Sequence, residues 1–391
     1  MGDFVVNTST AGGQSQSCAD GLISHSLFTA LWADSADAGI KGQRVDTAGT
    51  KVGTEFLASE ATPPGGNTDR RWPFVDSVGS NTFAAWIERP FNLPPPAPRV
   101  VLRRFFDGQP AGLPVQVNTD SIDLDFPPTV TRMIDGGCLV TWTGSGTQQR
   151  VRAQRFTPEG QKKGPEIAVN TTEAFHRHPA VTLLSNGDYV IAWTDGSAVG
   201  GGGLVYRVFG FDGVPRTGEV RPNVSGFAGR SALTALDNGR FVAAHINATV
   251  QSPLGVMQTT AVASVFHPGG SGQVIASAFA GSPNHFHRTS PALTALPGGR
   301  FVLAWVEKSA DTVETVPTVR AQLCSDSELE IGPKAVASSG TGGNRFHLSA
   351  AAVFGDGSPG SVFLSWADMV DGGDTTIRGR VLAVGPGGLT G

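Results

Sequence analysis

The chain has 391 residues, including 52 glycines and 26 prolines, and its formal net charge is −4. Glycine and proline make up about a fifth of the residues, which excludes a helical bundle or a coiled coil. Charged residues amount to only 16% and hydrophobic residues to 39%. The chain is therefore neither a highly charged disordered segment nor a basic nucleic-acid binder, and no run of about 18 apolar residues predicts a membrane span.

The sequence is built from repeats, each marked by a tryptophan at the end of an apolar run. The markers follow one another at intervals of about 51 to 61 residues, a period typical of repeat architectures. Seven such units account for the whole chain, so we expect a single domain over residues 1–391. In chain order the markers are Trp32, Trp86, Trp142, Trp193, His245, Trp305 and Trp366.

Each unit contains four strand-length segments. In the fourth unit they are residues 179–184, 189–194, 204–211 and 219–222. The first two are joined by a tight polar turn that contains Asn-Gly, which favours a hairpin. Four-stranded repeats with a tryptophan marker predict the blades of a β-propeller, whereas a β-solenoid would have shorter repeats.

The two ends of the chain complement each other. The last unit runs through its third strand at residues 378–384 and then stops, without a fourth strand. Residues 4–8, Phe-Val-Val-Asn-Thr, match the fourth strands of other units at residues 115–119 and 167–171. We therefore expect the N-terminal segment to complete the C-terminal blade, because an open ring would leave two unpaired sheet edges. The predicted fold is an all-β, seven-bladed β-propeller closed in this way.

The repeated cassette is G-x-x-V-x-x-W, followed by Arg-x-Gln-Arg-Phe at residues 152–156, a glycine turn and Val-Asn-Thr. It resembles the propeller repeats of bacterial secreted and cell-surface proteins over essentially the entire chain. That resemblance implies a secreted or cell-surface protein. The first residues show no basic segment followed by an apolar run, hence no signal peptide, and a cytoplasmic location stays open as the alternative. The Asp-rich calcium loop of integrin-type repeats and the Asp box of sialidases are missing.

Polar and aromatic residues gather where the predicted strands meet one face of the ring. The first strand of each unit begins, and the second ends, on the same face, so residues at these points should converge around one mouth of the central channel. Around the starts of the first strands lie Arg71, Trp72, His176, Arg177, His178, Arg230, His285, His287, Arg288, Arg345 and His347. Two residues after the markers lie the carboxylates Asp195, Glu307 and Asp368.

Two interpretations of these residues stay open. In the first, arginine or histidine pairs with carboxylate to tie neighbouring blades together, as a purely structural ring. In the second, they line a polar cup rimmed by aromatic rings. Arginine, carboxylate and aromatic side chains are the residue types that a sugar site uses, because they combine bidentate hydrogen bonds with an apolar ring face.

The histidines allow a third interpretation. His178, His287 and His347 come from different units but can point toward one axis, and neutral imidazole is a common transition-metal ligand. No loop has a specific metal-ligand spacing, and the sequence does not identify a cofactor. His245 replaces a marker tryptophan and is expected in the core. The three cysteines, Cys18, Cys138 and Cys324, are expected to be buried free thiols.

The sequence thus favours a ligand-binding propeller, most simply one that binds a carbohydrate or another polar or anionic small molecule. No nucleophile motif is present. The enzymatic alternatives are a polysaccharide lyase or hydrolase, in which arginine neutralises an acid group and histidine moves a proton, or a metal-dependent enzyme that uses the channel histidines. A structural scaffold with a protein partner is the remaining alternative. The near-neutral charge argues against nucleic acid in each case.

Overall fold

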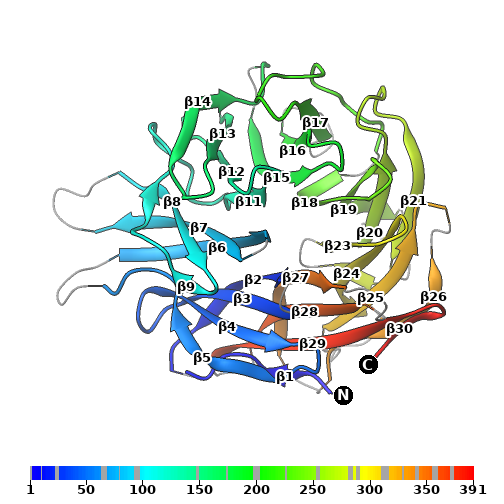
Figure 1. Cartoon of the computed structure of the whole chain (residues 1–391). Helices are drawn as coiled ribbons and strands as arrows, with labels where there is room; N and C mark the ends of the chain where they lie inside the picture. Colours follow the sequence, from blue (N-terminus) through cyan, green and yellow to red (C-terminus); the bar gives the residue numbers. More distant parts are fainter. Residues whose placement is uncertain are drawn as a thin grey trace.

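Seven antiparallel sheets follow one another along the chain and stand around a common axis in the computed structural model (Figure 1). The innermost strands, in chain order, are β2 (Gln14–Leu22), β6 (Thr68–Val78), β11 (Thr129–Arg132), β15 (His176–Leu183), β18 (Phe227–Ala235), β22 (His285–His287) with β23 (Ala292–Leu296), and β27 (Asn344–Val353). Each of them contacts the innermost strands of both neighbouring blades, and β27 in turn contacts β2. The circle is therefore closed, and the predicted seven-bladed β-propeller is confirmed.

The structure describes residues 2–9, 11–22, 26–62, 68–78, 80–91, 97–146, 149–172, 175–196, 203–224, 227–251, 256–280, 285–287, 291–309, 317–327, 330–339, 343–354, 360–369 and 374–391. Within these ranges the regular elements are strands, and none of the described residues forms a helix long and apolar enough to cross a membrane.

The remaining strands lie progressively farther from the axis. The second strands are β3 (Leu27–Asp34), β7 (Asn81–Pro90), β12 (Cys138–Thr143), β16 (Tyr189–Asp195), β19 (Phe241–Gln251), β24 (Arg300–Ser309) and β28 (Ser361–Met369). The third strands are β4 (Gly39–Asp46), β8 (Arg99–Phe106), β13 (Val151–Phe156), β17 (Gly203–Phe209), β20 (Val256–Phe266), β25 (Thr318–Ser325) and β29 (Thr375–Gly385). The outermost strands are β5 (Lys51–Leu57), β10 (Val115–Gln116), β14 (Lys162–Ala168), β21 (Val274–Ala280), β26 (Ile331–Val336) and β1 (Phe4–Val5), and the short β9 (Gln109–Pro110) and β30 (Gly388–Thr390) extend two blades.

The fourth blade departs from the expected strand bounds at both edges. Its first strand begins at His176 rather than at residue 179, because His176 and Arg177 pair with the end of β16 beyond a β-bulge. The strand expected at residues 219–222 is reduced to a single bridge between Tyr206 and Val220. Pro222 has no N–H group and cannot extend the ladder of hydrogen bonds.

A hydrophobic cluster lies between each pair of neighbouring blades. The second strands read as near-continuous apolar runs because they are covered on both faces. Trp86, for example, is 0% exposed and packs with Leu31 and Val75 at the interface of blades 1 and 2. Between blades 4 and 5, where His245 replaces the marker tryptophan, the ring of Phe241 packs on Tyr206 and Phe266 with centroids 5.1 and 5.3 Å away. The buried markers, together with the apolar side chains around them, therefore form the core between neighbouring blades.

The N-terminal strand completes the last blade, as the sequence predicts. In β1, Phe4 and Val5 pair antiparallel with Gly379 and Arg378 of β29. The two ends of the chain consequently lie close together on the same blade (Figure 1).

The repeated Val-Asn-Thr sequence has a structural role at the rim. The side-chain oxygen of Asn170 accepts a hydrogen bond from the Val151 amide of its own blade, at 2.8 Å. The amide of Thr171 then donates to Glu219 of the next blade, at 2.5 Å. The same pair of contacts is made at Asn7 and Thr8 and at Asn118 and Thr119. The motif thus ties one blade to the next.

Candidate functional site: the central cavity

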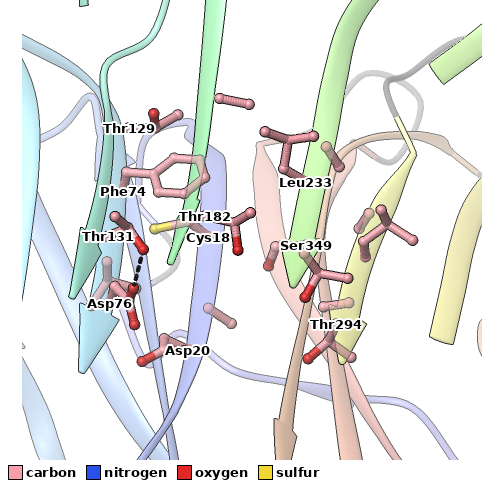
Figure 2. A pocket seen from close by; sticks show the side chains of 18 of the residues that line it. Cys18, Asp20, Phe74, Asp76, Thr129, Thr131, Thr182, Leu233, Thr294 and Ser349 are labelled. Atoms are coloured by element: carbon pink, nitrogen blue, oxygen red, sulfur yellow. Dashed lines mark hydrogen bonds between the residues drawn. The ribbon is translucent and has the colours of Figure 1, made fainter. Parts of the chain in front are cut away.

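A cavity of about 310 Å³ occupies the centre of the ring and is lined by the innermost strands of all seven blades (Figure 2). Its wall follows the register of those strands, because alternate residues of a strand point to the same side. Seven wall residues pair with the residue just before each marker, and we call them the middle ring. They are Cys18, Phe74, Thr129, Ala180, Ala232, Ala292 and Ser349.

Two further levels flank the middle ring. Two residues farther along the strands of blades 1 to 6 lies the lower ring, which consists of Asp20, Asp76, Thr131, Thr182, Thr234 and Thr294. Two residues before the middle ring lies the mouth ring, which we define as Gln16, Trp72, His178, Arg230 and His347. All of the mouth ring except His178 also line the cavity. The cavity thus has a mixed aromatic and basic mouth above a level of hydroxyl and carboxyl groups.

The mouth ring owes its position to a repeated distortion of the backbone. Gln16, Trp72, His178 and His347 have φ angles of 59°, 57°, 56° and 54°, in the left-handed region. Each sits where the pairing of the first strand with the second shifts by a β-bulge. A left-handed conformation is costly for a large side chain such as tryptophan, and such strain is concentrated at sites where a side chain must be re-aimed.

Hydrogen bonds link the mouth residues around the ring. The Gln16 amide donates to Nδ1 of His347 at 3.0 Å, and the Trp72 amide donates to Oε1 of Gln16 at 2.6 Å. The indole N–H of Trp72 donates to the carbonyl oxygen of Leu124 at 3.2 Å. The ring of Trp72 also meets His347 edge-on, with centroids 5.2 Å apart. These contacts run through blades 7, 1, 2 and 3 and fix the orientation of each side chain.

Arg230 is the most unusual residue of the mouth. Its guanidinium carbon lies 5.2 Å from the ring centre of Phe74, which belongs to a strand three blades away along the chain. Removal from water lowers the pKa of Arg230 to about 10. No carboxylate or other hydrogen-bonding group among the described residues pairs with its guanidinium. A partly buried cation without a partner is costly, and an anionic ligand would offset that cost.

Both mouth histidines are neutral near pH 7. The pKa of His347 is lowered to about 4, first by burial and then by the charge of Arg230. The pKa of His178 is also lowered to about 4, by burial and by Arg230 and Arg177. The His178 ring meets Phe126 edge-on at 4.7 Å, and its buried Nδ1 has no hydrogen-bond partner among the residues described. The guanidinium carbon of Arg177 lies over the same Phe126 ring, 5.9 Å from its centre.

The lower ring holds two carboxyl groups with different surroundings. Asp76 accepts hydrogen bonds from the Thr131 hydroxyl at 3.1 Å and from the Arg132 amide at 2.8 Å (Figure 2). Asp20 lies beside it, and its buried Oδ2 atom has no hydrogen-bond partner within the described part of the chain. Burial and the charge of Asp76 raise the pKa of Asp20 to about 7. Asp20 can therefore both donate and accept a proton near neutral pH.

Several of the predicted site residues lie away from the cavity wall. His176 is 0% exposed, accepts a hydrogen bond from the Trp193 indole at Nδ1 (3.1 Å) and contacts the Thr172 carbonyl oxygen through Nε2 (3.0 Å). Arg345 is 3% exposed, donates to the carbonyl oxygens of Pro317 and Ser339, and lies 3.7 Å from Asp368. Arg71 pairs with Asp69 on the same strand. These contacts hold the side chains in the body of the propeller, and the arginine–carboxylate pairs among them lie within one blade rather than between neighbouring blades.

The carboxylates after the markers also lie within the blades. Glu307 accepts the indole N–H of Trp305 at 2.9 Å and pairs with Arg320. Asp195 pairs with Arg221, and Asp368 lies 3.7 Å from Arg378 as well as from Arg345. Asp195, Glu307 and Asp368 are absent from the lining of the central cavity.

The sixth blade carries three predicted site residues whose side chains lie outside the description. His285 and His287 are described only as backbone of β22, and Arg288 lies outside the described residues. Among the side chains that are described, no group of three histidine, cysteine, aspartate or glutamate residues is arranged to hold a metal ion. All three cysteines are free and buried, as expected, and burial raises the pKa of the Cys18 thiol, so it is not a nucleophile near pH 7.

Sequence reasoning missed the lower part of the cavity. Asp20, Asp76 and the lower-ring threonines, like Phe74 of the middle ring, were not among the predicted site residues. A signal for them exists: each occupies the same position relative to the start of its unit, two or four residues after the mouth position. Counting alternate residues along the first strands would have found them.

The comparisons with known proteins identify the fold. No protein-family model matches the chain, and no curated protein matches it. Among solved structures, an ulvan lyase described as belonging to a new family of polysaccharide lyases, bound to -[GlcA(1-4)Rha3S]-, has a TM-score of 0.55 at 8% identity, with 100% of this chain and 96% of that chain covered. The endosialidase of phage phi92 has a TM-score of 0.52 at 9% identity, covering 97% and 69% of the two chains. Hydrazine synthase of Kuenenia stuttgartiensis has a TM-score of 0.52 at 11% identity, covering 95% and 96%. At these identities the similarity establishes the propeller fold and not a shared activity.

Proposed function

We propose that the protein binds a carbohydrate that carries an acid group, in the central cavity of the propeller. The observation that carries this proposal is the guanidinium of Arg230, which faces the cavity without an anionic partner among the described residues. A carboxylate or sulfate group on the ligand would supply that partner through charge-assisted hydrogen bonds.

The surroundings of Arg230 support a sugar rather than a bare anion. Trp72 and Phe74 line the cavity and offer aromatic faces or edges to the apolar side of a pyranose ring. The mouth histidines are neutral, so they add hydrogen-bonding groups without competing for the anion. Of the structural neighbours, the ulvan lyase is a polysaccharide lyase bound to -[GlcA(1-4)Rha3S]-, and the phage phi92 protein is an endosialidase.

The test is a binding measurement on acidic and neutral oligosaccharides by calorimetry, with Arg230→Gln as the variant. Hydrogen bonds to a charged group contribute about 1.5–3 kcal/mol, so we expect affinity for acidic oligosaccharides to fall by ~10- to 150-fold. Arg216→Gln is the matched control, because the Arg216 side chain is half exposed and its ion pairs within the described structure are with Asp188 and Asp212. Equal affinity for neutral and acidic sugars, unaffected by Arg230→Gln, would refute the proposal.

Cleavage of the bound polysaccharide is a second candidate function, favoured by one observation. His178 belongs to the mouth ring, beside the cavity rather than in its lining; it is neutral and its buried Nδ1 has no partner among the described residues, so it could accept a proton from a substrate whose acid group is neutralised by Arg230. If this is correct, acidic polysaccharide incubated with the protein is shortened, and His178→Asn abolishes shortening while leaving affinity within a few-fold. An unchanged polymer length would leave binding as the function.

A further inference from the structure

Among the residues that the structure describes, the wall of the cavity leaves the propeller axis as the way in. Its wall is a closed circle of innermost strands, in which each strand contacts its two neighbours. A polysaccharide that lies across the mouth can touch the mouth ring, but it cannot pass sideways through the wall. A group that reaches deeper must therefore enter end-on.

The anion partner lies below the mouth. Arg230 belongs to the mouth ring by register, but its guanidinium packs against Phe74 of the middle ring. An acid group that pairs with Arg230 is therefore drawn past Trp72 to the level of Phe74 and Cys18, where all seven blades contribute to the wall.

Unused hydrogen-bonding groups lie one level farther in. The lower ring is two residues along the strands from the middle ring, a rise of about 7 Å. None of the described residues forms a hydrogen bond with the hydroxyls of Thr182, Thr234 or Thr294, which line the cavity. The buried Oδ2 of Asp20 is likewise without a partner in the described structure.

The cavity also limits the size of what can enter. Its volume of about 310 Å³ is at the lower end of the range of roughly 300–1,000 Å³ found for small-molecule pockets. One sugar unit with its acid group fits such a space, which is too small for an extended stretch of polymer.

We infer that the cavity binds a single acidic sugar unit that enters end-on, with its acid group at Arg230 and its hydroxyl groups at Asp20 and the lower-ring threonines. This inference rests on the proposed function and specifies its ligand: a terminal unit of a chain or a free sugar acid, rather than an internal unit of a polymer. Asp20 and the threonines then decide which hydroxyl pattern is accepted, because each can donate or accept a hydrogen bond.

The experiment compares two isomeric trisaccharides that contain one glucuronate each, at the non-reducing end in one and in the middle of the other. Free glucuronic acid is the third ligand. Calorimetry with the full chain should give an affinity for the terminal isomer at least ~10-fold higher than for the internal isomer. Arg230→Gln should weaken whichever ligand binds. Asp20→Asn should lower the affinity for the terminal isomer by ~5- to 10-fold, whereas the surface variant Asp120→Asn should leave that affinity unchanged.

Thr182→Val provides a second variant that removes a hydroxyl with little change of shape, and tryptophan fluorescence verifies that each variant is folded. Equal affinity of both isomers, still lost in Arg230→Gln, would overturn the end-on inference and leave the proposed function intact. If neither isomer nor the free acid binds, the proposed function itself fails. Binding of free glucuronic acid as tight as that of the terminal isomer supports the single-unit site and identifies a free sugar acid as its ligand.

Discussion

Nδ1 of His347 accepts a hydrogen bond of 3.0 Å from the backbone amide of Gln16, which joins the last blade of the ring to the first. An amide N–H can only donate, so this contact requires Nδ1 of His347 to be unprotonated. The Ser17 hydroxyl, which donates to the His347 carbonyl oxygen at 2.8 Å, holds the same two strands together. The seam between blades 7 and 1 at the mouth is therefore sensitive to acid.

The first prediction concerns the pH dependence of stability. The pKa of His347 is about 4 in the folded protein and about 6.5 when the chain is unfolded, so the unfolded state binds the proton more readily between these values. The free energy of unfolding should fall as the pH drops from about 6.5 to about 4. The variant His347→Asn keeps an acceptor near the position of Nδ1 but cannot take up that proton. Its free energy of unfolding should therefore fall less than that of the original protein over this pH range, by on the order of 1–3 kcal/mol. Urea unfolding at pH 4.5 and 7.5 measures this difference. The prediction would be contradicted if the free energy of unfolding changed by the same amount between the two pH values in both proteins.

The second prediction compares two arginines with opposite surroundings. Arg70 is 8% exposed and pairs with the buried Glu88 at 2.7 Å, whereas Arg230 has no such partner among the described residues. Arg70→Met leaves the buried Glu88 carboxylate with one partner fewer and should lower the free energy of unfolding by about 3 kcal/mol or more. Arg230→Met removes a poorly solvated charge and should raise the free energy of unfolding of the ligand-free protein by about 1–2 kcal/mol. Denaturant titrations of both variants test the contrast, which would be wrong if both variants were destabilised equally.

The third prediction concerns Asp20. Its pKa is raised to about 7 in the folded protein from 3.8, so the folded state holds the proton more tightly. The contribution of Asp20 to the free energy of unfolding therefore decreases as the pH rises from about 4 to about 7. Asp20→Asn removes the titration and should be more stable than the original protein at pH 8 by about 1–2 kcal/mol, with little difference at pH 4. Thermal unfolding at the two pH values checks it, and a variant less stable at pH 8 would argue against a buried carboxylate here.

The fourth prediction separates two neighbouring histidines. His176 accepts the indole N–H of Trp193 in the interior of its blade, whereas His178 stands at the mouth with Nδ1 unpartnered among the described residues. His176→Phe leaves a buried indole donor unsatisfied and should cost about 1–3 kcal/mol, with no effect on ligand affinity. His178→Phe should alter affinity instead. Calorimetry and urea unfolding of the same two variants measure both properties, and an affinity loss confined to His176→Phe would reverse the assignment.

The fold could be predicted from the sequence because its signals are repeated. The marker tryptophans recur at the interfaces between blades, where each is needed to fill the same space, and Val-Asn-Thr recurs where one blade is tied to the next. Repetition makes each signal readable even where a single unit departs from it, as at His245. The missing fourth strand of the last unit predicted the pairing of β1 with β29 for the same reason.

The site could be predicted only in part, because it depends on where the repeats are distorted. Of the residues expected at the mouth, Trp72, Arg230 and His347 line the cavity. His176 and His178 differ by two residues and should share a strand face, but the left-handed backbone at His178 separates their surroundings. No glycine marks that conformation at Gln16, Trp72, His178 or His347, so nothing in the residue types signals it.

The lower ring was missed for a different reason. A threonine in a strand is ordinary, and only the closed circle of strands turns four threonines and two aspartates into one polar level. Such a level is a property of the assembled ring and of no single repeat.

The contact between the two ends of the chain also determines when the protein can be finished. Asn7 accepts a hydrogen bond from the Ile377 amide at 2.8 Å, across a separation of 370 residues. During synthesis on a ribosome, blades 1 to 6 can form in order, but β1 must wait for β29, whose Ile377 is made 370 residues after Asn7. Until then the nascent chain carries an incomplete ring. Its unpaired strand edges can pair with the wrong strand or with another chain. Closing so long a loop is slow, and once closed it has to reopen before the blades can separate. β1 is thus made before any of the seven blades is complete, yet it finds its partner only after the third strand of the last blade has been made.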